Sequence, residues 1–119
     1  MSPKFIVYCG QELDDERDVP DNVPGYCWAM FPERDGGANY VRGVVREQIR
    51  TNTPTVFVTR YEHVVSELAS QVADGNVSRD DVLFVLVRDD ENDNVMKTEH
   101  KMSADNQYIG DNWPMGILW

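Results

Sequence analysis

The sequence predicts an α/β fold with a small parallel sheet, extended by an antiparallel hairpin at its C-terminal end. Three runs of β-branched and aromatic residues, at 5–9, 55–59 and 82–87, are typical of buried strands. Two stretches with apolar residues at helical spacing, 40–50 and 62–73, alternate with them. Strands that alternate with helices are expected to pair in parallel, because each helix returns the chain to the same end of the sheet.

The first predicted strand, Phe5 to Cys9, is followed by a long loop over about residues 10–38. The loop is rich in proline, glycine and acidic residues and has no apolar period. Its exception is the apolar patch at 26–31, which contains Trp28 and Phe31. Either this patch folds back on the core as a short strand, or it contacts a partner.

The two predicted helices are amphipathic, and each has a terminus signal. Asn39 is the expected N-cap of the first helix, and Gly75 stands at a suitable C′ position after the second. The apolar stripes consist of Val41, Val44, Val45 and Ile49, and of Val64, Val65, Leu68, Ala69 and Val72. We expect one core that contains Val56, Phe57, Val58, Val64, Val65, Leu68, Val72, Leu83, Val85 and Val87.

The C-terminal part predicts a hairpin. Residues 89–94 are turn formers, and 95–102 alternates as a half-exposed edge strand does. One face of that strand would carry Met96, Thr98, His100 and Met102. Residues 107–109 are expected to return as a short strand. Because 119 residues match the size of one domain, residues 1–119 are expected to form a single domain.

Composition narrows the classes of function. The chain has 119 residues and a formal net charge of −10, which would repel a phosphate backbone, so we expect no nucleic-acid partner. The apolar run at 82–87 is far shorter than the roughly 20 residues of a spanning helix, so we expect no membrane partner and a cytoplasmic location.

Candidate chemistry is sparse. The acidic runs 12–21 and 89–93 lack the spacing of a calcium loop and are interpreted as solvated charge. His63 could act as a base, but the sequence places no nucleophile beside it, and His100 is interpreted as a sheet-face residue. No glycine-rich phosphate loop is present. Cys9 and Cys27 are expected to be free thiols, and no metal or cofactor is predicted.

A family resemblance covers about Tyr40 to Leu118. It is carried by 55–65, by Leu68, by 72–82 and by the closing Trp113-Pro114-Met115-Gly116. This arrangement resembles the C-terminal part of ABC-type AAA ATPases of the OLD-like group, which end in a short domain containing Trp-Pro. The family has a strand ending in Glu-Thr-His-Ser, an Ala-Glu-Gly turn after the next helix, and a final Trp-Pro-x-Gly-Phe.

The resemblance also implies that the catalytic positions are degenerate. If the alignment is extended upstream of Tyr40, Cys9 and Gly10 stand where the family has its metal-binding and water-activating acids. Within the alignment, Arg60 and Tyr61 replace the switch histidine and the residue after it. Without these groups and a phosphate loop, ATP hydrolysis loses both positioning and charge stabilisation. We therefore expect no ATPase activity.

These observations favour a non-catalytic protein-binding module derived from an ATPase-like scaffold, of viral or mobile-element origin, that modulates a related ATPase. The alternatives are a structural or virion-associated protein and a divalent-cation-dependent enzyme that uses the acidic loop. The partner would be another protein or a second copy of the chain. The candidate interface residues are large and apolar: Trp28, Phe31, Trp113, Pro114, Ile117 and Trp119.

Overall fold

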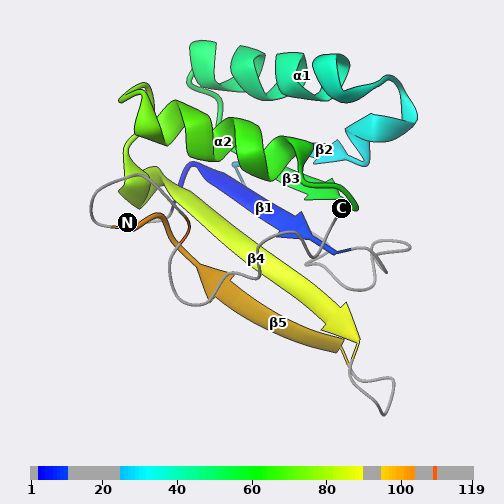
Figure 1. The fold of residues 1–119 in the computed structure, drawn as a ribbon. Helices are drawn as coiled ribbons and strands as arrows, with labels where there is room; N and C mark the ends of the chain where they lie inside the picture. Colours follow the sequence, from blue (N-terminus) through cyan, green and yellow to red (C-terminus); the bar gives the residue numbers. More distant parts are fainter. Residues whose placement is uncertain (1–2, 11–24, 90–94, 104–108, 110–119) are drawn as a thin grey trace.

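The computed structural model describes residues 3–10, 25–89, 95–103 and 109 (Figure 1). Within these residues, one sheet carries two α-helices. The strands are β1 (Phe5–Cys9), β2 (Cys27–Met30), β3 (Thr55–Thr59), β4 (Val82–Asp89) and β5 (Val95–His100). The helices are α1 (Ala38–Arg50) and α2 (His63–Ala73), with 3₁₀ turns η2 (Pro32–Arg34) and η3 (Arg79–Asp81).

The sheet has five strands in the order β2-β3-β1-β4-β5. The strand β1 lies in the middle and pairs in parallel with β3 and β4, so that Val7 stands opposite Phe57 and Phe84. The strand β2 pairs in parallel with β3, and β5 pairs antiparallel with β4. The predicted fold class, a parallel core extended by an antiparallel hairpin, is confirmed.

Both helices cover the same face of the sheet (Figure 1). Each follows a parallel strand and returns the chain to the start of the next, which places its apolar stripe against the strands. The cluster under the helices includes Phe5, Val7, Val41, Val45, Phe57, Val64, Leu68, Val72 and Phe84, all of them buried. This cluster is the larger core of the molecule.

The opposite face of the sheet has its own apolar cluster. Its buried members are Phe31, Val56, Val58, Val85 and Val87, with Ile6, Tyr8, Trp28, Met30 and Leu83 partly buried against them. The prediction of one core is therefore wrong. Successive side chains of a strand point to opposite faces, so neighbours such as Phe57 and Val58 belong to different clusters.

The apolar patch at 26–31 forms a strand, β2, which settles its secondary structure. The predicted N-cap of α1 is wrong, because the helix begins at Ala38 and includes Asn39. The N-cap is Gly37, whose backbone is extended and which provides no side-chain cap. The predicted C′ glycine of α2 is confirmed, since Gly75 has a φ of +82°.

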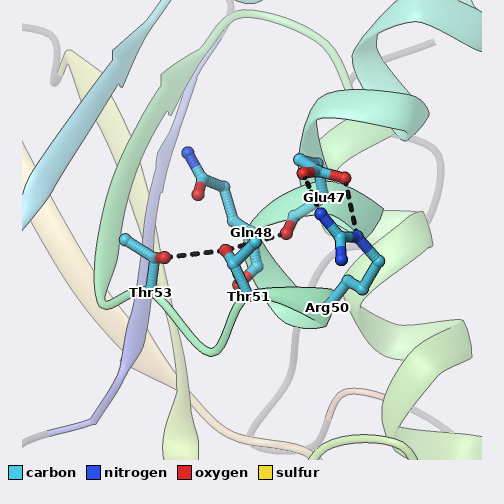
Figure 2. A network of polar contacts seen from close by, with 5 residues as sticks. All are labelled: Glu47, Gln48, Arg50, Thr51 and Thr53. Atoms are coloured by element: carbon cyan, nitrogen blue, oxygen red, sulfur yellow. Dashed lines mark hydrogen bonds and ion pairs between the residues drawn. The ribbon is translucent and has the colours of Figure 1, made fainter.

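A polar network closes α1 and turns the chain into β3 (Figure 2). The Thr51 hydroxyl donates to the Glu47 carbonyl over 3.0 Å and shares a hydrogen bond of 2.7 Å with the Thr53 hydroxyl. The Arg50 Nε donates to Glu47 Oε2 over 3.0 Å on the exposed side of the same turn. The turn thereby aligns Thr55, whose amide donates to the Lys4 carbonyl at the start of the sheet.

The hairpin strand departs in part from its predicted alternation. His100 and Met102 are buried, whereas Met96 and Thr98 on the same predicted face are exposed. His100 is a satisfied sheet residue, since its Nε2 lies 2.8 Å from the Thr98 hydroxyl. Ile109 forms an antiparallel bridge with Met102, and the rest of the predicted returning strand lies outside the described residues.

Candidate functional site

The parallel strands β1, β2 and β3 end at the same edge of the sheet, where ligands bind in many α/β proteins. The residues at the degenerate motif positions meet there. The Cys9 thiol donates to the Tyr61 carbonyl over 3.4 Å, and the Gly10 amide donates to the Thr59 carbonyl over 3.2 Å. A Cβ at Gly10 would lie 2.3 Å from the Val87 carbonyl oxygen, so only glycine fits at this position.

Glu33 connects the end of β2 to the end of β3. Its Oε1 accepts hydrogen bonds from the Thr59 hydroxyl over 3.0 Å and from the Arg60 amide over 2.9 Å. Its Oε2 is buried and has no hydrogen-bond partner among the described residues. Glu33 is not among the predicted site residues, because one acid within an acid-rich loop carries no local signal of a long-range contact.

The Cys9 thiol is surrounded in a way that keeps it protonated. Burial raises its pKa well above its usual range, and the negative charges of Glu62 and Glu33 raise it further. Glu62 is only 7% exposed, and burial also raises the pKa of its carboxyl group. Because the thiolate is the nucleophile in cysteine chemistry, this arrangement disfavours covalent catalysis by Cys9.

His63 opens α2 beside this cluster. Its ring stacks on Tyr61 with ring centroids 6.2 Å apart. Its Nδ1 is buried, and within the described part of the chain no group forms a hydrogen bond with it. The Ser66 hydroxyl donates to the His63 backbone carbonyl over 3.5 Å rather than to the ring, which gives no nucleophile–base pair. Across the described ranges, no group of three or more histidine, cysteine or acidic residues could hold a metal ion.

Phe31 ends β2 in a left-handed conformation, with a φ of 47°. The Arg34 and Arg60 guanidinium groups lie 4.2 and 5.2 Å from the centre of its ring, within the range of cation–π contacts. Phe31 is itself buried. Phe31, which was predicted as an interface residue, is therefore a core residue in the described chain, and it fixes the end of β2.

On its outer edge, β2 has backbone groups that no strand of the described sheet pairs with. Toward β3, the Cys27 amide donates to the Pro54 carbonyl over 2.9 Å, and the Phe31 amide donates to the Val58 carbonyl over 2.7 Å. Alternate residues of a parallel strand bond to the same neighbour, so the amides and carbonyls of Trp28 and Met30 face away from β3. Among the residues that the structure describes, none bonds to these outward groups.

The side chains of β2 contain no charge. Trp28 and Met30 are partly buried in the cluster on the face opposite the helices, Ala29 packs against the helix-covered core, and Cys27 is exposed. The other edge strand differs, because β5 exposes Lys97 and Glu99. Charged side chains discourage pairing at a sheet edge, and β2 has no such protection.

Several predicted site residues lie outside the described ranges. They are Trp113, Pro114, Ile117 and Trp119 of the candidate interface, and the acids of 12–21 and 90–93. The structure brings together Cys9, Gly10, Arg60 and Tyr61, and it places Trp28 on a separate surface at the β2 edge. No described helix has the length and apolar character needed to cross a bilayer.

Comparisons with family models, with curated proteins and with solved structures found no match to this chain. The resemblance to OLD-like ATPases therefore stays a prediction from the sequence.

Proposed function

We propose that this chain is a non-catalytic protein-binding module whose binding surface is the outer edge of β2. One observation carries the proposal. The backbone amides and carbonyls of Trp28 and Met30 face away from β3, on an uncharged strand at the edge of the sheet. Addition of a strand to an open edge is a common mode of protein recognition, in which the backbone groups supply the hydrogen bonds.

The cluster at the carboxyl end of the sheet supports a binding role over a catalytic one. The Thr59 hydroxyl donates to Glu33, the Cys9 thiol donates to a backbone carbonyl, and burial raises the pKa of that thiol. These groups connect β1, β2 and β3 to one another. Their contribution to the proposed function is to hold the β2 edge rigid, which lowers the entropy lost when a strand is added.

The resemblance suggests which kind of partner to examine. If the chain derives from an ATPase-like scaffold, a related ATPase is a natural candidate, and the module would act by occupying a surface that the intact enzyme uses. The alternative of a cation-dependent enzyme depends on acidic residues of the 12–21 loop, which lie outside the described ranges. No observation favours that alternative.

The test is site-specific photocrosslinking in the cells that make the protein. A benzophenone amino acid replaces Cys27, which is exposed beside the edge. We expect discrete covalent adducts with this variant. Adding Met30→Pro should remove them, because proline lacks the amide that faces a new strand, yet this position donates no hydrogen bond to β3.

A matched control carries the benzophenone at Ser70, an exposed residue of α2. We expect it to give none of these adducts. Thermal melting must show that Met30→Pro stays folded. The proposal is wrong if benzophenone at position 27 yields no adduct. It is also wrong if the same adducts persist when Met30→Pro is added and the protein stays folded.

A further inference from the structure

Resting on the proposed function, we propose that the strand added to β2 is β2 of a second copy of this chain, paired antiparallel about a two-fold axis at Ala29. The sheets of the two copies would then be continuous. The argument rests on the hydrogen-bonding pattern, the side chains and the charge of the edge.

The backbone pattern of the strand is self-complementary. Trp28 and Met30 are the residues of β2 whose amides and carbonyls both face outward, and they lie symmetrically about Ala29. With Ala29 on the axis, Trp28 of one copy exchanges both of its hydrogen bonds with Met30 of the other. Every outward group of the two strands is thereby paired once.

The side chains fit the same register. Ala29 meets its symmetry mate at a position without hydrogen bonds, where strands approach to about 4.5 Å between Cα atoms, and a methyl group allows that approach. Trp28 and Met30 lie on the same face of the sheet, so each indole ring meets a thioether of the other copy. The pair would extend the partly buried apolar cluster across the axis.

Charge favours a second copy over a charged foreign segment. The strand carries no acidic or basic side chain that could select an oppositely charged peptide. An isologous pairing places no like charges opposite each other within the strands. The net charge of −10 on each copy nevertheless opposes association at long range, so the dimer should be strengthened by salt.

The register makes a sharp prediction for disulfide cross-linking. Two cysteines at position 29 would have Cα atoms within the 4.4–6.8 Å range, roughly, that a disulfide spans. The native Cys27 residues would lie about 13 Å apart along the strands, because a strand rises about 3.3 Å per residue, so they cannot pair. The parent protein, which keeps Cys27, should therefore form no disulfide across the axis and serves as a separate control.

The experiment compares two variants in a Cys27→Ser background, Ala29→Cys and Ser70→Cys, oxidised in air and separated on non-reducing gels. Ala29→Cys should give at least about tenfold more covalent dimer, because paired thiols meet at a far higher effective concentration than free ones. Light scattering on the unmodified protein should show a dimer that strengthens from about 0.05 to about 0.5 M salt. Folded Met30→Pro should be monomeric.

Equal cross-linking of the two variants, or a dimer that persists in folded Met30→Pro, would overturn the second-copy assignment. The photocrosslinking result tests the proposed function separately from the dimer. If the chain stays monomeric but the Cys27 photocrosslinker captures a different protein in a Met30-dependent way, the edge still binds a partner and only the dimer is wrong. If neither is seen, both proposals fall.

Discussion

The neighbouring strands β2 and β3 are both short, uncharged and largely apolar, yet they differ completely in exposure. All five residues of β3, Thr55–Thr59, are buried, whereas β2 has an exposed Cys27 and three partly buried residues. The reason is position: β3 has a hydrogen-bonded strand on each side, and β2 has one in the described sheet. The comparison shows that strands of similar composition are buried in the middle of a sheet and partly exposed at its edge, where our proposal gives β2 a role in recognition.

The largest expected effect separates these two strands directly. Phe57 is fully buried under the helices, so Phe57→Ala should lower the free energy of unfolding by about 3 to 5 kcal/mol. Trp28→Ala removes a larger side chain but should cost less, because Trp28 is only partly buried. Urea denaturation at low protein concentration, where a proposed dimer would dissociate, measures both. Equal losses would contradict the distinction between centre and edge.

A second prediction concerns the helix that covers the centre of the sheet. Leu68 is fully buried on α2, and Leu68→Ala should cost about 2 to 5 kcal/mol. The matched control is Ser70→Ala on the exposed side of the same helix, which should stay within about 0.5 kcal/mol of the parent protein. If Leu68→Ala lowered the free energy of unfolding by less than about 0.5 kcal/mol, Leu68 would not be part of the packed core under α2.

Much of this fold follows from local sequence patterns. The period of the apolar residues placed β1, β3, β4 and both helices, because a strand and a helix bury side chains at different spacings. Local patterns do not encode which strand lies at an edge. The patch at 26–31 therefore remained either a strand or a partner contact until the strand order placed β2 outermost. It is both an ordinary strand and, in our proposal, a contact surface.

The errors have equally specific causes. The expectation of one core treated Phe57 and Val58 as equivalent, although they face opposite sides of the sheet. The N-cap prediction at Asn39 relied on residue type alone, while the helix begins earlier, after Gly37. Glu33 could not be found because its partners Thr59 and Arg60 lie far along the sequence. Of these errors, the one at Glu33 shows that local patterns do not encode long-range contacts.

The third prediction tests the connection between β2 and β3. Glu33→Ala removes the acceptor of the Thr59 and Arg60 hydrogen bonds and should cost about 1 to 3 kcal/mol, since these donors then lose their partner. Glu33→Gln should cost less, because the amide oxygen can still accept both bonds. Unfolding curves of the two variants give the comparison. Equal stability of Glu33→Ala and the parent would mean that the end of β2 is held by Phe31 and its arginine contacts alone.

The smallest expected effect is a pH-dependent one at Glu62, where α2 begins. Burial raises the pKa of this carboxyl group, so the folded chain binds the proton more tightly than the unfolded chain does. The resulting stabilisation is fully present below the unfolded pKa and is lost as the pH rises through the folded pKa. Glu62→Gln cannot lose it, so its melting temperature should exceed that of the parent at neutral pH.

The difference between Glu62→Gln and the parent should shrink as the pH falls and disappear at about pH 3, which lies below the pKa of the carboxyl in both the folded and the unfolded chain. Glu67→Gln is a control of opposite sign. Burial alone would raise the pKa of Glu67, but the hydrogen bonds from Gln71 and Arg46 outweigh it and lower that pKa. Glu67→Gln should therefore lose stability at neutral pH.

If Glu62→Gln also melts at a lower temperature than the parent at neutral pH, the prediction is wrong. The positive end of the α2 dipole would then outweigh burial, and the Glu62 carboxylate would stabilise the carboxyl end of the sheet.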